Sequence, residues 1–142
     1  VIKSEKQLLR INHRLTNIRT NHVHQATRAI INRKPRFVCL EDLNVQGMMK
    51  NKHLSEKVQE QNFYEFRRQI GYKAHWAKIP VVIADRWFPS SKTCIECGHV
   101  KKDLKLSDRK YVCPVCGNVI DRDFQASLNL KRYGEMELSK SV

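Results

Sequence analysis

The chain has 142 residues, of which 41% are hydrophobic, enough for one domain, or one domain with a small appendage, around a modest core. Its 27 Lys and Arg against 14 Asp and Glu give a formal net charge of +13. That charge favours a polyanionic partner such as nucleic acid, although a solvated basic surface would also produce it. No apolar run is long enough to span a bilayer, and no signal-peptide pattern opens the chain.

The first predicted element is a long basic helix over residues 3–33. Its apolar positions recur at steps of three and four residues and form one stripe: Leu8, Ile11, Leu15, Ile18, His22, Ala26 and Ala29. The stripe predicts packing against a domain, with the basic side either touching phosphates or simply meeting water. Pro35 is expected to end this helix.

Two short apolar runs, separated by a second helix, come next. "RFVCLED" at 36–42 and "VVIAD" at 81–85 predict buried strands, and residues 43–53 read as a loop. Residues 56–78 predict a helix with one apolar face, formed by Phe63, Phe66, Ile70, Ala74 and Ala77. This order indicates a parallel β-α-β crossover in an α/β domain. Because two strands do not make a stable sheet, further strands must come from missing residues or from another chain. The start at Val1 also suggests a piece of a longer protein.

Four of the five cysteines form two C-x-x-C pairs, Cys94 with Cys97 and Cys113 with Cys116. Two such pairs, each followed by a glycine, predict a closed tetrahedral thiolate site for structural Zn²⁺. A catalytic zinc or a redox dithiol fits less well. The same usage indicates a reducing cytosol. We expect Cys39 to be buried, His99 to be exposed, and His22 and His24 to have ordinary surface or packing roles.

The acidic residues Glu41 and Asp123 are the candidates for a catalytic role. Alternation along 36–42 places Phe37, Cys39 and Glu41 on one strand face. Glu41 thus stands at the carboxyl end of a strand, where α/β folds place functional groups, although a solvated strand-end acid is the simpler alternative. Asp123 opens a final helix predicted over 124–132, where its ordinary role would be that of an N-cap.

Together these stretches resemble the carboxyl-terminal part of TnpB, the RNA-guided nuclease of bacterial insertion sequences that is related to type V CRISPR effectors. The matching stretches are "LEDLNVQGM", "FYEFRRQIGYKAHW", "DRWFPSSKTCIECG", "YVCPVCG" and "DRDFQASLNL". The resemblance implies an α/β fold: a partial RNase H-like (RuvC) domain with an inserted four-cysteine zinc ribbon. The implied boundaries are 1–89 for the RuvC-like portion, 90–120 for the ribbon, and 121–142 for the final helix and tail.

The resemblance also implies site residues. Glu41 matches the second catalytic carboxylate and Asp123 the third, with Asp121 as the near alternative, and these acids would hold catalytic Mg²⁺. Nucleic-acid contacts are expected from Arg109, four residues before Cys113, and from residues in two of the matching stretches: Lys92, Ser91, Arg67 and Arg68, with Ser90 beside them. The implied partners are target DNA, guide RNA and the amino-terminal remainder of the nuclease, in a bacterial or archaeal cytosol.

Two departures from the family pattern matter. The family's first catalytic Asp and its initial strands do not precede the basic helix here. The family also usually reads D-R-D-x-N-A-A, whereas Gln125 and Ser127 stand at two of those positions. The leading hypothesis is therefore a segment of a Mg²⁺-dependent RNA-guided DNA endonuclease. The alternatives are a nuclease-inactive nucleic-acid-binding remnant, acting as a repressor or guide-RNA accessory, and a zinc-stabilised module that binds no nucleic acid.

Overall fold

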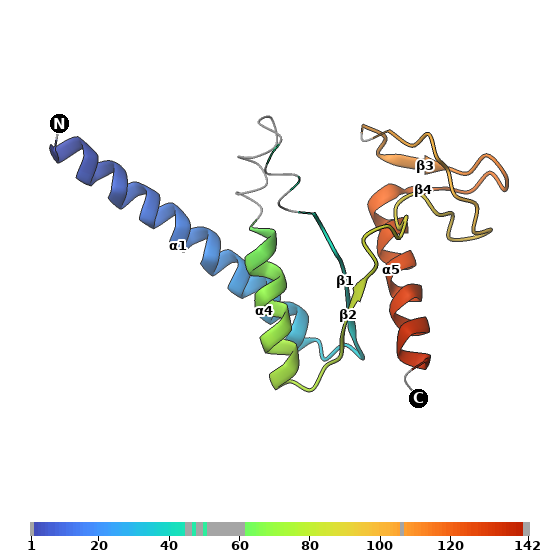
Figure 1. Cartoon of the computed structure of the whole chain (residues 1–142), viewed down its shortest axis with the longest axis horizontal. Coiled ribbons are helices and arrows are strands. Elements are labelled where there is room, and N and C mark those ends of the chain that lie inside the picture. Colours follow the sequence, from blue (N-terminus) through green and yellow to red (C-terminus); the bar gives the residue numbers. More distant parts are fainter. Residues whose placement is uncertain (1, 45–46, 48–49, 51–61, 106, 141–142) are drawn as a thin grey trace. The chain divides into compact units, whose positions relative to one another are not determined.

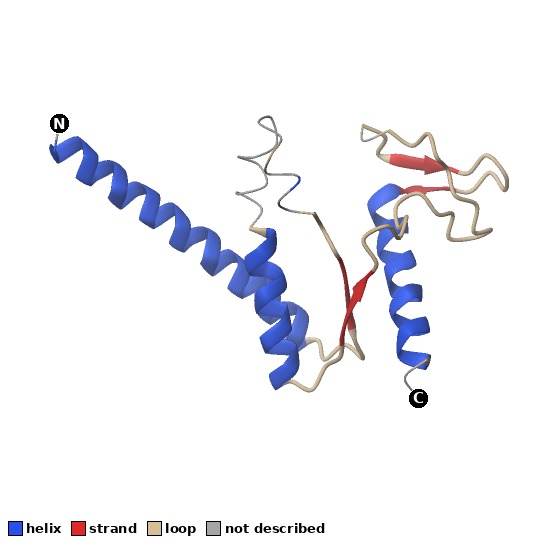
Figure 2. Ribbon diagram, in the orientation of Figure 1, coloured by secondary structure: helices blue, strands red, loops and turns tan. Residues whose placement is uncertain are grey.

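The structure, a computed structural model, describes residues 2–44, 47, 50, 62–105 and 107–140. It divides into two compact units, and we describe each by itself. The first comprises Val1–Arg36 with Asn44–Val81, and the second comprises Phe37–Leu43 with Val82–Val142. Figures 1 and 2 show the elements of each unit. Within the described ranges, no helix combines the length and hydropathy needed to cross a membrane.

The first unit is a pair of packed helices, α1 (Ile2–Asn32) and α4 (Phe63–Trp76). The helix predicted over 3–33 is confirmed, and it stops before Lys34, which has a positive φ of 49°, and Pro35. The second predicted helix is confirmed from Phe63 onward, whereas its predicted start at 56–61 lies outside the described residues. Most of the predicted loop at 43–53 lies outside them as well.

The packing face predicted for α1 is wrong. Leu8, Ile11 and Ile18 of the predicted stripe are 59%, 49% and 56% exposed, and the buried positions are Val23 and Thr27. The reason is length: 31 residues extend about 46 Å, whereas the 14 residues of α4 extend about 21 Å. Because α4 is the shorter helix, it can cover only part of α1.

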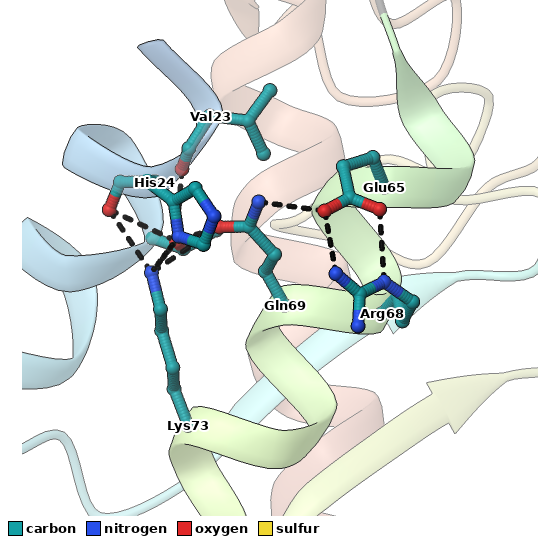
Figure 3. Close-up of polar contacts among 7 residues, drawn as sticks. Val23, His24, Glu65, Arg68, Gln69 and Lys73 are labelled. Atoms are coloured by element: carbon teal, nitrogen blue, oxygen red, sulfur yellow. Dashed lines mark hydrogen bonds and ion pairs between the residues drawn. The ribbon is translucent and has the colours of Figure 1, made fainter. Parts of the chain in front are cut away.

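A buried polar cluster joins the two helices (Figure 3). The Thr27 hydroxyl lies 3.0 Å from Gln69 Oε1, and both side chains are fully buried. Lys73 Nζ donates to Thr27 Oγ1 at 2.6 Å and to the His24 carbonyl at 3.0 Å. Burial lowers the pKa of the Lys73 ammonium, and the positive charge of Arg28 lowers it further. His24 therefore has the packing role expected of it.

The second unit contains a two-stranded sheet, formed by β1 (Val38–Glu41) and β2 (Val81–Ala84), and helix α5 (Arg122–Ser139). Both predicted strands are confirmed, and they run in the same direction in Figure 1. Helix α5 packs on β1, and Gly134 makes this approach possible because a Cβ there would overlap the Phe37 ring and touch Cys39. The face of β1 that carries Phe37, Cys39 and, by alternation, Glu41 thus lies toward α5.

The segment between β2 and α5 contains a small antiparallel hairpin, β3 (Lys110–Val112) and β4 (Val119–Asp121), in which Tyr111 lies opposite Ile120. Tyr111 is fully buried against Cys94 and Cys113, with Leu104 and Ile120 packed beside them. The final helix predicted over 124–132 is confirmed, but it is longer at both ends. It begins directly after β4, so the hairpin returns the chain straight into α5.

Candidate metal centre and acidic cavity

The four paired cysteines converge on one point. Cys94, Cys97, Cys113 and Cys116 place their sulfur atoms within 4.8 Å of one another, and they form the one such cluster among the described residues. The Sγ atoms of Cys94 and Cys116 are 3.6 Å apart, and those of Cys97 and Cys113 are 3.5 Å apart. Tetrahedral coordination with Zn–S bonds of about 2.3 Å requires sulfur atoms about 3.8 Å apart. The spacing therefore fits a single four-coordinate metal ion.

Two matching turns create this spacing. In each turn the glycine after the second cysteine donates its N–H to the carbonyl of the first: Gly98 to Cys94 at 2.9 Å and Gly117 to Cys113 at 3.1 Å. Both glycines have left-handed backbone, with φ of 76° and 74°. A side chain at either position would strain the turn, so C-x-x-C-G is the local sequence that this geometry requires.

The environment of the turns shifts the cysteine pKa values in opposite directions. Backbone N–H groups, first that of Cys116, lower the pKa of the Cys113 thiol to about 6. The pKa of Cys116 rises instead, to about 12, because burial and the neighbouring sulfurs outweigh the N–H of Asn118. Four crowded thiolates repel one another, and a divalent cation removes this repulsion.

The other candidate ligands lie outside this centre. The His99 backbone carbonyl accepts hydrogen bonds from the Cys94 N–H at 2.8 Å and from the Tyr111 hydroxyl, and its side chain is half-buried rather than exposed. Cys39 is half-buried in β1, where burial raises the pKa of its thiol. His22 is exposed on α1, as an ordinary surface residue would be.

A cavity of about 390 Å³ in the second unit brings Glu41 and Asp123 together. Glu41 comes from the end of β1 and Asp123 from the first turn of α5, on opposite sides of the cysteine segment in sequence. The remaining lining residues are mostly basic or small: Ser91, Lys92, Leu104, Lys105, Arg122 and Ala126. Four residues singled out in the sequence, Glu41, Ser91, Lys92 and Asp123, thus share one cavity.

The alternative role of Asp123 as an N-cap does not hold, because Asp121 caps α5. Asp121 Oδ1 accepts the N–H groups of Asp123 and Phe124, both at 3.0 Å. The Asp123 side chain is 80% exposed and lies 3.6 Å from Arg122 Nε. Asp121 is absent from the cavity lining. Of the two acids, Asp123 is therefore the one available to a ligand in the cavity.

Sequence reasoning missed two basic residues of the cavity, Lys105 and Arg122. The Arg122 guanidinium donates to the Lys105 carbonyl at 3.2 Å, and the Lys105 N–H is held by Asp108 at 2.9 Å. The middle position of D-R-D, which directly precedes Asp123, was the available signal for Arg122. Lys105 had no such signal, because only the folded loop brings it to the acids.

The other predicted contacts lie elsewhere. Arg109 is exposed just before β3 and does not line the cavity, and its carbonyl accepts the Arg122 N–H at 2.9 Å. Arg67 and Arg68 are exposed on α4, in the first unit. Arg68 already forms a two-pronged ion pair with Glu65, at 2.7 and 2.8 Å. Their contacts with nucleic acid stay predictions.

Three side chains of α5 bind the backbone of residues 90–95, and we call them the α5 clamp: Gln125, Asn129 and Arg132. Gln125 is fully buried and accepts the Ile95 N–H at 3.3 Å. Asn129 donates to the carbonyls of Ser90 and Thr93, both at 2.7 Å. Arg132 donates to the Ile95 carbonyl. The clamp thus fixes the first cysteine turn to α5.

Comparison with known proteins agrees with this architecture. Residues 63–130 match the family model "Cas12f1-like, TNB domain". A Streptomyces pristinaespiralis protein provisionally named an RNA-guided DNA endonuclease is 35% identical, covering 93% of this chain and 32% of its own length. A similarly named protein of Mycobacterium tuberculosis is 36% identical, covering 91% and 29%.

Among solved structures, a Cas12f1–sgRNA–target DNA complex contains a chain that matches with a TM-score of 0.59 and 22% identity. The match covers 91% of this chain and 35% of that one, and at this identity it shows the fold alone. The chain thus spans about a third of the length of the relatives it matches. Its sequence and fold make it a relative of the TnpB-like RNA-guided DNA endonucleases and of the type V effectors that include Cas12f1.

Proposed function

We propose that this chain supplies two of the metal-binding carboxylates of an RNA-guided DNA endonuclease that cleaves DNA by Mg²⁺-dependent phosphodiester hydrolysis. The observation that carries the proposal is the shared cavity, in which Glu41 and Asp123 are accompanied by Lys92, Lys105 and Arg122. The acidic side chains can bind a divalent metal ion, and the basic side chains beside them can bind phosphates. This combination suits a polyanionic substrate that is bound through the metal.

The two acids are carried by different secondary-structure elements and can both bind a metal ion in the cavity. Hard cations such as Mg²⁺ prefer carboxylate oxygens, and Glu41 and Asp123 are the carboxylates that line the cavity. When bound, Mg²⁺ would activate water and stabilise the leaving oxygen. Glu41 is fixed at the strand end, whereas Asp123 is exposed in the first turn of α5.

The basic residues of the cavity would bind the sugar–phosphate backbone. Lys92 and Lys105 can contact phosphates as flexible point charges, whereas the Arg122 guanidinium can bind two phosphate oxygens at once. Ser91 adds a neutral hydrogen-bonding group to the same wall. Such contacts position the scissile bond without reading sequence, which fits an enzyme whose guide RNA selects the target.

The fold around this cavity is, in our proposal, part of a RuvC-like, RNase H-type domain with 90–120 as an inserted zinc ribbon. The described part of the β1–β2 sheet has two strands, too few for independent stability. Additional strands, and the first catalytic Asp, would come from the remainder of the protein or from another chain. The four thiolate ligands would hold structural Zn²⁺, and free cysteines in metal-binding spacing support a reducing compartment such as the cytosol.

The decisive experiment is cleavage of target DNA by the complete protein loaded with guide RNA. We expect Mg²⁺-dependent cleavage that falls about a hundred- to a thousandfold, the scale for one lost transition-state-stabilising group, in Glu41→Ala and Asp123→Ala, with DNA binding retained. Asp103→Ala, which removes an exposed acid outside the cavity lining, should cleave normally.

The same experiment separates the alternatives. Wild-type protein that binds DNA or guide RNA but never cuts would support the nuclease-inactive remnant. Binding that does not weaken steeply with salt would support a module without nucleic acid, because phosphate-driven binding releases counterions.

A further inference from the structure

We propose that Asn129 and Ser90 are positioning residues that hold the Glu41 carboxylate at the cavity that it shares with Asp123. The inference rests on the proposed function and deepens it by assigning the side chains that set the geometry of the acid pair. Neither residue lines the cavity, so neither is expected to touch substrate or metal.

The first contact is between Ser90 and Glu41. The Ser90 hydroxyl donates a hydrogen bond to Glu41 Oε1, and Ser90 is only 5% exposed. A carboxylate with one oxygen held by a buried donor loses rotational freedom, while its second oxygen stays available to another ligand. Hydrogen bonds to a charged acceptor are stronger than those between neutral groups, so this donor can fix the side chain.

The second contact fixes Ser90 itself. Asn129 uses both hydrogens of its amide, one on the Ser90 carbonyl and one on the Thr93 carbonyl, and it is 5% exposed. These two bonds pin the backbone on both sides of Ser91 and Lys92, which line the cavity. Helix α5 therefore holds residues 90–93 in place, and Ser90 in turn holds Glu41.

The same helix presents Asp123. The cavity-lining residues of α5 and the clamp residues lie on adjacent faces of one helix, at about 100° per residue. Asn129 thus connects the element carrying one acid to the hydroxyl that orients the other. A rigid connection of this kind sets the separation of two metal-binding groups more reliably than the ends of a loop could.

The chemistry at position 129 is specific. Aspartate is nearly isosteric with asparagine but has no amide hydrogens. In Asn129→Asp the two backbone carbonyls would therefore lose their donors and face a carboxylate, which can only accept hydrogen bonds. At position 90, alanine removes only the hydroxyl, whereas threonine retains it. Ser127 provides a matched control, because its exposed hydroxyl on α5 donates to the Phe124 carbonyl of its own helix.

The test is Mn²⁺ binding to the complete protein, measured by electron paramagnetic resonance, in wild type and five variants, with Ser90→Thr as a sixth variant that tests rescue. Glu41→Ala and Asp123→Ala should abolish the site. Ser90→Ala and Asn129→Asp should weaken Mn²⁺ binding about 10- to 100-fold, as loss of groups that orient metal ligands does. Ser127→Ala should bind as wild type does. The Co²⁺–thiolate absorption of the four-cysteine centre should be unchanged in all five, which shows that the fold persists.

The outcomes separate the two proposals. If neither Glu41→Ala nor Asp123→Ala alters Mn²⁺ binding, the acid pair of the proposed function is overturned. If those two abolish binding while Ser90→Ala and Asn129→Asp bind normally, only the positioning role is overturned. Should Asn129→Asp lose the Co²⁺ signature, Ser90→Ala alone decides the positioning role, with recovery in Ser90→Thr as the expected support.

Discussion

Asp121 Oδ1 accepts a hydrogen bond from the backbone N–H of Asp123 at 3.0 Å. The two acids, which are separated by a single arginine, therefore have different roles. Asp121 ends the hairpin and caps α5, whereas Asp123 extends from the first turn of that helix. An acid in the first turn is also stabilised by the helix dipole, which favours negative charge at this end. The capping acid thus keeps the carboxylate of Asp123 free for other contacts.

This division predicts opposite phenotypes for the two acids. Asp121→Ala should lower the free energy of unfolding by about 1 kcal/mol, the usual effect of losing an N-cap, and Asp121→Asn should recover most of it. Asp123→Ala should leave stability nearly unchanged while removing metal binding. Chemical denaturation of the three variants and of wild type measures this. Equal destabilisation by Asp121→Ala and Asp123→Ala would contradict the assignment of the cap.

Gln125 gives a prediction that runs against family preference. The related family usually has asparagine here, but the Gln125 Oε1 in this protein accepts the Ile95 N–H at 3.3 Å from a fully buried position. Asparagine is shorter by one methylene and would leave that N–H unpaired. We expect Gln125→Asn to lower the free energy of unfolding by about 1–3 kcal/mol.

Thermal or denaturant unfolding checks this, with Ser127→Ala as the control because it introduces the family residue at an exposed position. If Gln125→Asn were as stable as wild type, the segment around Ile95 could shift to meet the shorter side chain. The clamp would then be less rigid than its contacts indicate.

The sequence predicted the elements well because their signals are local. The C-x-x-C-G turns needed only their own residues, and the long helix needed only its apolar periodicity and Pro35. The pairing of Glu41 with Asp123 across some 80 residues came from family resemblance, since no local pattern contains it. The structure supports that pairing to the extent of one shared cavity.

What sequence reasoning missed depends on tertiary contacts. The apolar stripe of α1 predicted a packing face, but the position of the shorter α4 decides which residues are buried, and it selects Val23 and Thr27. Lys105, Ser90 and Asn129 carry no motif of their own. Their roles follow from which carbonyl or carboxylate the folded chain brings next to them.

The Glu65–Arg68 pair on α4 predicts a specific pH dependence. Hydrogen bonds from Arg68, and then from Gln69, lower the pKa of Glu65 from 4.5 to about 2. Because the pKa is lower in the folded state, the pair stabilises the fold above about pH 4.5, and this stabilisation is lost as pH falls toward 2. Arg68 is 52% exposed, so solvent screening reduces this contribution.

A carboxyl NMR titration should find Glu65 still ionised at pH 3, and Arg68→Gln should return its midpoint toward 4.5. Glu65→Gln should flatten the pH dependence of unfolding between pH 4.5 and 2. A wild-type midpoint near 4.5 would show that the ion pair does not persist in solution.

Removing the metal ion from the four-cysteine centre should destabilise the β3–β4 hairpin. The hairpin β3–β4 has a small core, in which Tyr111 packs against Cys94 and Cys113. With so little apolar surface, its stability must depend on metal coordination. We expect a chelator to reduce hydrogen-exchange protection of residues 110–112 and 119–121 about a hundredfold, the factor for a ligand at about 100 times its Kd. Cys113→Ser should reproduce this loss, and Cys39→Ser, outside the cluster, should not.

Since the clamp ties the first cysteine turn to α5, metal loss should also weaken Mn²⁺ binding at Glu41 and Asp123. Unchanged protection after chelation would show that the hairpin folds without metal, and the acid pair would then not depend on the cysteine centre.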